Sequence, residues 1–219
     1  DILQARYAPA FMPRRAPARS TLPPSGKRHA AVIGGGLAGC AVAWALAEQG
    51  WTCSVLDRHG HPAEEASGNP AGLFHGIVNA QDGVHARFNR AAALEAERVI
   101  RLGVQAHHVG GEVRGLLRLE TTGAGVEEMQ GTLRRLGLPA TYVQALEADE
   151  ASAAAGLRLA HPAWFYPGGG WVKPAELARS FLDLAADQAR FRGSTAGDAL
   201  RRANVRWQLL DATGEVIEE

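Results

Sequence analysis

A glycine-rich turn between a short apolar strand and an alanine-rich helix constrains the fold of this chain more than any other feature. The sequence predicts the strand over 30–33 and the helix over 40–49, and between them Gly34, Gly36 and Gly39 stand in G-x-G-x-x-G spacing. In that pattern the first glycine permits a tight turn, the second lets the backbone approach a pyrophosphate, and the third lets helix and strand pack closely. The motif is informative only in this strand–turn–helix context, which here favours dinucleotide binding.

A second strand, expected over 51–57, completes a βαβ unit and predicts an α/β fold with a parallel sheet. Dinucleotide-binding folds carry an acidic residue about 20 residues beyond the glycine turn, and Asp57 takes that place. Its carboxylate can accept hydrogen bonds from the 2′- and 3′-hydroxyls of a ribose, whereas the free N–H groups at the start of the helix suit phosphates. A 2′-phosphate would be repelled by Asp57, so the pattern disfavours NADP.

The loop after this unit bears on the choice between FAD and NAD. Residues 65–72 read Glu-Ala-Ser-Gly-Asn-Pro-Ala-Gly, where a nicotinamide dehydrogenase would ordinarily begin its next crossover helix. A polar, glycine-containing loop can wrap a long cofactor, which favours FAD, and the plainer alternative is a surface turn. The residues alone leave both interpretations open.

Composition excludes several classes of protein. With 219 residues, 46% of them hydrophobic, the chain can bury a sizeable core. It has no apolar run of transmembrane length and no signal-peptide pattern, so we expect no membrane span. Its two cysteines, Cys40 and Cys53, cannot make a disulfide framework or a four-ligand zinc site. We therefore expect a cytoplasmic protein that holds no metal.

A net charge of zero hides an uneven distribution. Residues 1–28 hold six Lys or Arg and one acid, which leaves 17 basic and 22 acidic residues for 29–219. The acidic body argues against a general nucleic-acid binder, so any RNA contact must be local. Five prolines and no apolar period over 1–28 predict an extended linker or tail.

The rest of the chain predicts alternating helices and short strands without an internal repeat. We expect helices over 86–105, 126–136, 150–155 (with Asp149 as the N-cap) and 174–189, and strands over 116–121, 205–210 and 215–217. The expected organisation is a linker over 1–28, the first part of a cofactor domain over 29–110, an α+β domain over 111–190, and strands that return to the cofactor domain over 191–219.

Three segments together resemble one family of flavoproteins. They are 32–40, 65–75 and 169–174, the last reading Gly-Gly-Trp-Val-Lys-Pro. From about residue 6 to its end the chain is similar to the FAD domain of the MnmC family of bifunctional tRNA-modification proteins, and more broadly to the D-amino-acid oxidase and glycine oxidase superfamily. The resemblance implies a Rossmann-type FAD-binding domain with an inserted α+β substrate domain, whose C-terminal part is missing from this sequence, and a methyltransferase domain upstream.

The activity that the resemblance implies is oxidation of an amine on RNA. The family's FAD domain removes the carboxymethyl group from 5-carboxymethylaminomethyl-(2-thio)uridine at the tRNA wobble position and gives 5-aminomethyl-(2-thio)uridine. The methyltransferase domain then methylates that amine with S-adenosyl-L-methionine. Two alternatives stay open, namely a glycine or D-amino-acid oxidase acting on a free small amine and a truncated module without catalysis.

Carried over by position, the resemblance implies one set of residues for the cofactor and one for the substrate. The cofactor set is Gly34, Gly36, Leu37, Ala38, Gly39, Asp57, Arg58, Ser67, Asn69, Ala71 and Gly72. The substrate candidates are His75, Tyr166 and Trp171, with Lys173 or Arg87 as a partner for a carboxylate or phosphate. Each has a structural alternative, because a lone histidine is often a hydrogen-bonded core residue and the aromatic run 164–166 is typical of a core. No Ser/His/Asp or Cys/His set stands out, so no catalytic residue is assigned.

Overall fold

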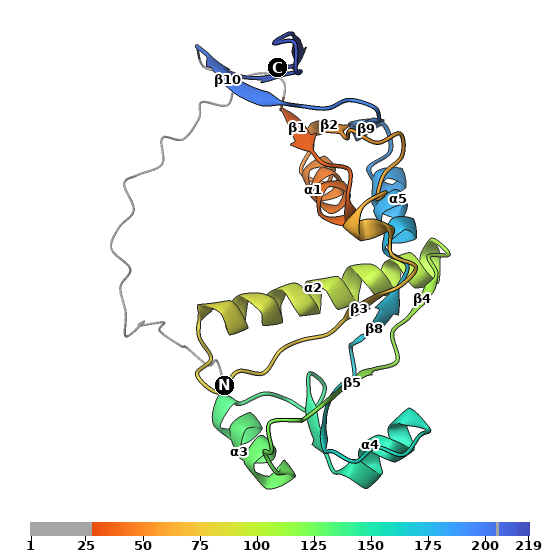
Figure 1. Ribbon diagram of the computed structural model, residues 1–219, viewed down its shortest axis with the longest axis vertical. Coiled ribbons are helices and arrows are strands. Elements are labelled where there is room, and N and C mark those ends of the chain that lie inside the picture. The colour runs from red at the N-terminus through yellow and green to blue at the C-terminus, as the bar shows by residue number, and fades with distance from the viewer. Residues whose placement is uncertain (1–27, 205) are drawn as a thin grey trace, which may run out of the picture.

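The computed structural model of the protein describes residues 28–204 and 206–219, so the linker expected over 1–28 lies outside it except for Arg28. The described residues form a mixed α/β fold. Figure 1 shows a parallel sheet near one end, the long helix α2 (Val84–Ala106) across the middle, and an antiparallel sheet with two helices at the other end. Among the described residues, no helix is long and apolar enough to cross a membrane.

The parallel sheet has the strand order β1-β2-β9, with β1 at His29–Ile33, β2 at Thr52–Leu56 and β9 at Ala189–Arg192. Helix α1 (Leu37–Ala47) connects β1 to β2, so the predicted βαβ unit is confirmed. The helix begins earlier than predicted because the turn is already complete at Gly36, its N-cap.

Helix α5 (Pro174–Ala185) packs against α1 and leads into β9. The ring of Trp44 on α1 stacks on the ring of Phe181 on α5 at a centroid distance of 5.2 Å. An aromatic pair of this kind adds about 0.5–1.5 kcal/mol beyond the area it buries. Cys40, on the same side of α1, is fully buried in this cluster. The interface between α1 and α5 therefore forms the main core beside the parallel sheet.

The predicted helix over 174–189 is wrong at its C-terminal end. Ala186 has a φ of +47°, a short 3₁₀ turn occupies Ala186–Gln188, and Ala189 is the first residue of β9. Because β9 pairs with β2 in parallel, α5 and β9 extend the α/β layer. The sequence places the helix in the segment 111–190 and expects strands that return to the cofactor domain over 191–219, and β9 spans that boundary.

Two three-stranded antiparallel sheets lie beyond this layer. The first has the order β3-β8-β4, and the second has the order β5-β7-β6. Their strands are β3 (Gly72–Phe74), β4 (Gly111–Glu112), β5 (Leu116–Leu119), β6 (Gln144–Leu146), β7 (Ala163–Tyr166) and β8 (Gly170–Val172). The sequence indicated a loop where β3 lies, because a strand this short has no readable alternation.

Helices α3 (Val126–Leu136) and α4 (Ala148–Ala155) accompany the second antiparallel sheet. The bounds of α3 are as predicted, and Gly137 ends it with a φ of +64°. Asp149 is not the N-cap of α4, since Glu147 takes that position in a capping box with Glu150. The Glu147 N–H donates to the Glu150 carboxylate at 2.9 Å, which starts the helix earlier than predicted.

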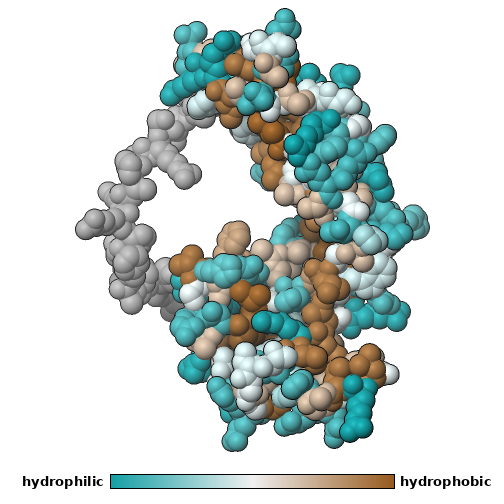
Figure 2. Space-filling view, viewed as in Figure 1, coloured by the Kyte–Doolittle hydropathy of each residue, from teal (hydrophilic) through white to brown (hydrophobic). Residues whose placement is uncertain are grey.

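A third antiparallel sheet holds β10 (Ala199–Ala203), β11 (Arg206–Leu210) and β12 (Val216–Glu218), and β11 and β12 overlap the predicted strands. In the described part of the chain no strand pairs with the outer edge of β1. Nearby apolar side chains stay exposed, with Ile33 at 55% and Trp207 at 60%. Figure 2 shows hydrophobic residues at the surface of both the upper and lower parts. Such surface is typical of regions that contact other protein segments.

Candidate functional site: a cavity at the ends of the parallel strands

A cavity of about 490 Å³ opens at the carboxyl ends of β1, β2 and β9. Parallel strands end at the same edge of a sheet, and this edge is where open α/β sheets bind ligands. The cavity walls come from the glycine turn, the segment after β2 and the segment after β9. The residues that bring polar side chains to it include Asp57, Arg58, His59, Glu65, Ser67 and Thr195.

Two glycines of the turn are required by its geometry. Gly34 has a φ of +100°, and its N–H donates to the carbonyl of Leu56 at 2.8 Å, which ties the turn to β2. A Cβ on Gly39 would lie 1.9 Å from the carbonyl oxygen of Gly34. Any side chain there would push α1 away from β1, so the close packing of helix on strand depends on this glycine.

The second glycine of the motif faces a protein loop. A Cβ on Gly36 would lie 3.2 Å from the hydroxyl oxygen of Ser67. That hydroxyl accepts a hydrogen bond from the N–H of Leu37 at 3.0 Å, so Ser67 caps the first turn of α1. The sequence assigned Gly36 to the approach of a pyrophosphate. The structure adds that the short 3₁₀ turn Ala66–Gly68 already lies against this position.

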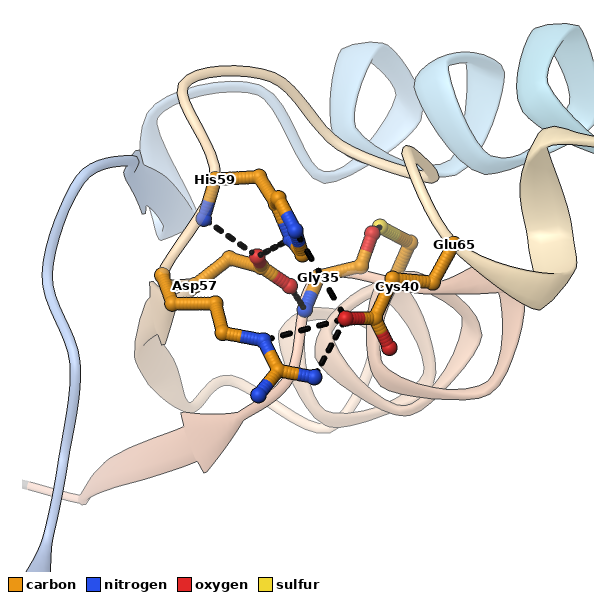
Figure 3. A network of polar contacts seen from close by, with 6 residues as sticks. Gly35, Cys40, Asp57, His59 and Glu65 are labelled. Carbon is orange, nitrogen blue, oxygen red and sulfur yellow. Dashed lines mark hydrogen bonds and ion pairs between the residues drawn. The ribbon is translucent and has the colours of Figure 1, made fainter.

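Asp57 is the centre of the polar network in Figure 3. One carboxylate oxygen accepts from the N–H of Gly35 at 2.7 Å, and the other accepts from the N–H of His59 at 2.8 Å and from His59 Nδ1 at 3.0 Å. Burial by itself would raise the pKa of Asp57, but these donors lower it below its usual value. The group is therefore an ionised acceptor at neutral pH, at the place where the sequence expects a ribose partner.

Arg58 and Glu65 form an ion pair across the mouth of the cavity. Arg58 Nε lies 3.0 Å from Glu65 Oε1, and a second guanidinium nitrogen contacts the same oxygen. The ring of His59 approaches Glu65 from the other side, with Nε2 at 3.5 Å from Oε1. Because the Arg58 and Glu65 side chains are 66% and 55% exposed, water and salt screen this pair strongly.

Cys40 lies directly beneath the glycine turn. Its thiol donates to the carbonyl of Gly35 at 3.4 Å. Burial, with a smaller contribution from the charge of Asp57, raises the pKa of this thiol to about 11. Cys40 is therefore a protonated packing residue at neutral pH and has no thiolate character for nucleophilic chemistry.

The remaining members of the predicted cofactor set divide into two groups. Leu37, Ala38 and Gly39 form the first turn of α1, next to Gly36, but they do not line the cavity themselves. Asn69, Ala71 and Gly72 lie outside the cavity lining. Asn69 Nδ2 donates to the carbonyl of Ala66 at 3.0 Å and so closes its own loop, and Gly72 begins β3, where it pairs with Val172.

Two of the three substrate candidates are brought together in a second site. The rings of His75 and Tyr166 lie 5.1 Å apart, and the ring of Tyr142 meets Tyr166 edge-on at 6.1 Å. We call His75, Tyr142 and Tyr166 the aromatic cluster. Nδ1 of His75 donates to the carbonyl of Gly76, which fixes the orientation of the ring.

The two tyrosines of the cluster differ in their hydrogen bonding. The Tyr142 hydroxyl donates to the carbonyl of Ile77 and accepts from its N–H, both at 3.2 Å. Within residues 28–204 and 206–219, the Tyr166 hydroxyl is buried and has no hydrogen-bond partner. Burial raises the pKa of Tyr166 to about 12 against the opposing effect of the nearby Arg118 side chain and Val78 main chain, so the hydroxyl remains a protonated donor. A buried phenol without a well-formed hydrogen bond is costly, so this hydroxyl is a candidate for contact with a substrate.

The other substrate candidates lie elsewhere. Trp171 lies on β8 and is 36% exposed. It pairs with Leu73 of the neighbouring strand β3, which is itself 76% exposed, so this face of the sheet is turned away from the core. Lys173 is the N-cap of α5, and its ammonium group pairs with Glu176 at 3.0 Å. Arg87 is exposed on α2. The structure does not bring these three residues into the aromatic cluster.

Sequence reasoning missed two contributors to the cavity. His59 follows Asp57 by two positions, a spacing at which an aspartate accepts the N–H of the later residue in a turn. That local signal could have identified it. The segment from Thr195 to Asp198 comes from beyond β9, and only the pairing of β9 with β2 brings it to the cavity.

Comparison with known proteins assigns the class. The family model described as FAD-dependent oxidoreductase matches residues 29–219. The chain therefore belongs to the FAD-dependent oxidoreductase family, which confirms the resemblance drawn from the three motifs.

Within that family the chain is 41% identical, over 219 residues, to the tRNA 5-methylaminomethyl-2-thiouridine biosynthesis bifunctional protein MnmC of Methylibium petroleiphilum. The match covers 100% of this chain and 33% of that protein. The chain thus spans a third of the length of the curated relative it matches.

Solved structures of amine oxidases share the fold. Glycine oxidase from Bacillus cereus matches with a TM-score of 0.62 at 24% identity, over 87% of this chain and 53% of the oxidase. Iminodiacetate oxidase from a Chelativorans species matches with a TM-score of 0.61 at 26% identity, over 88% of this chain and 53% of that enzyme. The mixed α/β fold with its parallel βαβ sheet is therefore that of about half of such a flavoenzyme.

Proposed function

We propose that the chain is part of an FAD-dependent oxidoreductase that removes the carboxymethyl group from 5-carboxymethylaminomethyl-(2-thio)uridine at the tRNA wobble position. The product is 5-aminomethyl-(2-thio)uridine, ready for methylation with S-adenosyl-L-methionine by a methyltransferase domain of the same polypeptide. The observation that carries this proposal is the 41% identity, along the whole chain, to a protein named for tRNA 5-methylaminomethyl-2-thiouridine biosynthesis.

The chemistry of the related oxidases supports the proposal. Glycine oxidase and iminodiacetate oxidase are named for substrates in which nitrogen carries a carboxymethyl group. The modified uridine contains the same unit, a nitrogen bonded to CH2–COO⁻. The common feature is a C–H bond next to an amine nitrogen, and the three proteins would differ in what else the nitrogen carries.

The residues of the cavity at the carboxyl ends of the parallel strands fit the adenosine diphosphate half of FAD. The N-terminus of α1 adjoins the cavity, which is where a pyrophosphate binds in such folds, although the Leu37 N–H is already bonded to the Ser67 hydroxyl. Asp57 is an ionised acceptor for a ribose hydroxyl. The cavity of about 490 Å³ matches the size of ligand sites in general. Bound FAD would supply the electron pair acceptor for the amine C–H bond.

The substrate side of the proposal rests on the aromatic cluster. Oxidation of the N–CH2 bond to C=N, followed by addition of water, releases glyoxylate and leaves the free aminomethyl group on the uridine. Tyr166 has a buried hydroxyl without a partner in the described residues, and His75 is oriented by the contact of Nδ1 with the carbonyl of Gly76. We propose that these two side chains orient the carboxymethylamine. The protein would then act by positioning the substrate, and water, not a protein side chain, would be the nucleophile that adds to the C=N bond.

A comparison of substrates tests the proposal. The full-length protein is first purified, and a yellow preparation with flavin absorbance, or one that becomes yellow on addition of FAD, is expected. It is then incubated with tRNA carrying the carboxymethylaminomethyl group, with unmodified tRNA, and with free glycine or sarcosine. We expect glyoxylate only from the modified tRNA. Turnover of the small amines alone would replace the proposal with a free-amine oxidase, and failure to take up FAD would replace it with a module without catalysis.

A further inference from the structure

We infer that His59 is a positioning residue that turns the Asp57 carboxylate so that a single lone pair faces the cavity. The site then recognises one hydroxyl of the adenosine ribose, either the 2′ or the 3′, and does not bind both. This inference rests on the proposed binding of FAD and concerns how this chain holds the adenosine end.

Counting acceptor positions leads to this conclusion. A carboxylate offers about four lone-pair positions, two on each oxygen. On Asp57, Oδ1 receives two donors from His59, its N–H at 2.8 Å and its ring Nδ1 at 3.0 Å. Oδ2 receives the N–H of Gly35 at 2.7 Å. Three positions are thus filled by the protein, and the one that remains is on Oδ2.

Neighbouring groups hold both the ring and the main chain of His59 in place next to Asp57. Because a carboxylate only accepts, Nδ1 of His59 carries the proton in this contact, and Nε2 points toward Glu65 at 3.5 Å. The carbonyl of His59 accepts the N–H of Ser194 at 2.8 Å, and the carbonyl of Asp57 accepts the N–H of Thr195 at 2.7 Å. The segment after β9 therefore fixes the main chain on both sides of Arg58.

Packing next to this segment leaves little freedom. A Cβ on Gly193 would lie 2.4 Å from the carbonyl oxygen of Gly60 and 2.8 Å from that of His59. The side chains of His59 and Asp57 are 33% and 15% exposed, so the contact between them is partly shielded from water. Main-chain contacts and the ring of His59 together oppose rotation of the carboxylate.

The first test uses ADP, 2′-deoxy-ADP and 3′-deoxy-ADP as probes, with the Kd of each measured by calorimetry on the full-length protein. A hydrogen bond to a charged group is worth about tenfold in affinity. We expect one deoxy analogue to bind about tenfold more weakly than ADP and the other within about twofold of it. Equal losses for both analogues would overturn the inference.

Three variants of His59 separate positioning from general loosening of the site. The amide of His59→Asn can donate from about the place of Nδ1, whereas the amide of His59→Gln reaches toward Nε2 and Glu65. We expect His59→Asn to keep the difference between the two analogues. We expect His59→Ala and His59→Gln to narrow it to within about twofold, because loss of the ring donor opens a second acceptor position, on Oδ1, to the other hydroxyl.

Failure of this inference can be distinguished from failure of the proposed FAD binding. A general loss of packing would weaken all three nucleotides alike and keep the difference between the analogues, and that result in His59→Ala would overturn the inference while FAD binding stands. If the unaltered protein binds neither ADP nor FAD, the proposed cofactor falls and this inference falls with it.

Discussion

The cavity at the ends of the parallel strands and the aromatic cluster are built in different ways. In the cavity, the glycine turn, Asp57 and the segment after β9 contact one another largely through main-chain groups, at N–H to oxygen distances of 2.7–2.8 Å. In the aromatic cluster, rings from positions 75, 142 and 166 meet through side chains. We therefore expect the stability and ligand binding of the cavity to change most when atoms are added to its glycines. In the cluster, we expect the loss of individual polar atoms to matter most.

The largest effect is expected from Gly39→Ala. Its Cβ would lie 1.9 Å from the carbonyl oxygen of Gly34, which belongs to the main chain and cannot rotate away. Separating α1 from β1 should cost about 3 kcal/mol of unfolding free energy and abolish binding of ADP. Urea denaturation followed by circular dichroism measures the loss.

Gly131→Ala is the matched control for this change. Gly131 lies within α3, where the nearest atom to an added Cβ is the mobile end of Arg134 at 4.0 Å. Alanine in a helix interior should raise stability by about 0.5–1 kcal/mol. Equal and small effects of both substitutions would show that the cavity does not depend on close main-chain packing.

A second test of the cavity uses the charge of Asp57. The Asp57→Asn variant loses charged acceptors for Gly35 and His59, which should cost about 2 kcal/mol near neutral pH. Because the pKa of Asp57 is lowered in the folded protein, this contribution is complete above the ordinary aspartate range and disappears as the pH falls through the lowered pKa.

The difference in unfolding free energy between the unaltered protein and Asp57→Asn should therefore be smaller at about pH 3 than at about pH 7. Asp183→Asn, at an exposed position of α5, is the control and should change stability by less than about 0.5 kcal/mol. A gap that stays constant with pH would mean that the carboxylate charge is not what the site uses.

The same contrast explains what could be predicted from the sequence. The βαβ unit, the turn and Asp57 lie within 30 consecutive residues, so propensity and spacing place them together. Strand β3 escaped prediction because three residues carry no periodic signal. The proximity of His75 to Tyr166 depends on the register of β3 against β8 and on the turn between β7 and β8, which no local pattern contains.

A smaller loss of stability is expected from substitutions where the glycine turn contacts the loop that holds Ser67. In Gly36→Ala the new Cβ would lie 3.2 Å from Ser67 Oγ, and displacement of the hydroxyl should cost about 1 kcal/mol. Ser67→Ala alone should cost a similar amount, about 1 kcal/mol, because the cap on Leu37 is lost. In the double variant the clash is absent, so the combined loss of stability should be smaller than the sum. Strict additivity in the denaturation curves would contradict direct contact between the two positions.

The smallest change in stability is expected in the aromatic cluster, where each tyrosine is replaced in turn by phenylalanine. The two variants together separate a packing role from a substrate contact. Tyr142→Phe breaks two hydrogen bonds with Ile77 and should cost about 1 kcal/mol. Tyr166→Phe removes a buried hydroxyl that has no partner in the described residues, so stability should stay the same or rise slightly. Under the proposed function the order reverses for catalysis, since Tyr166→Phe should lower the rate on modified tRNA. If Tyr166→Phe destabilised the fold as much as Tyr142→Phe and left the rate intact, Tyr166 would be a packing residue, and the cluster would hold no substrate contact from this side chain.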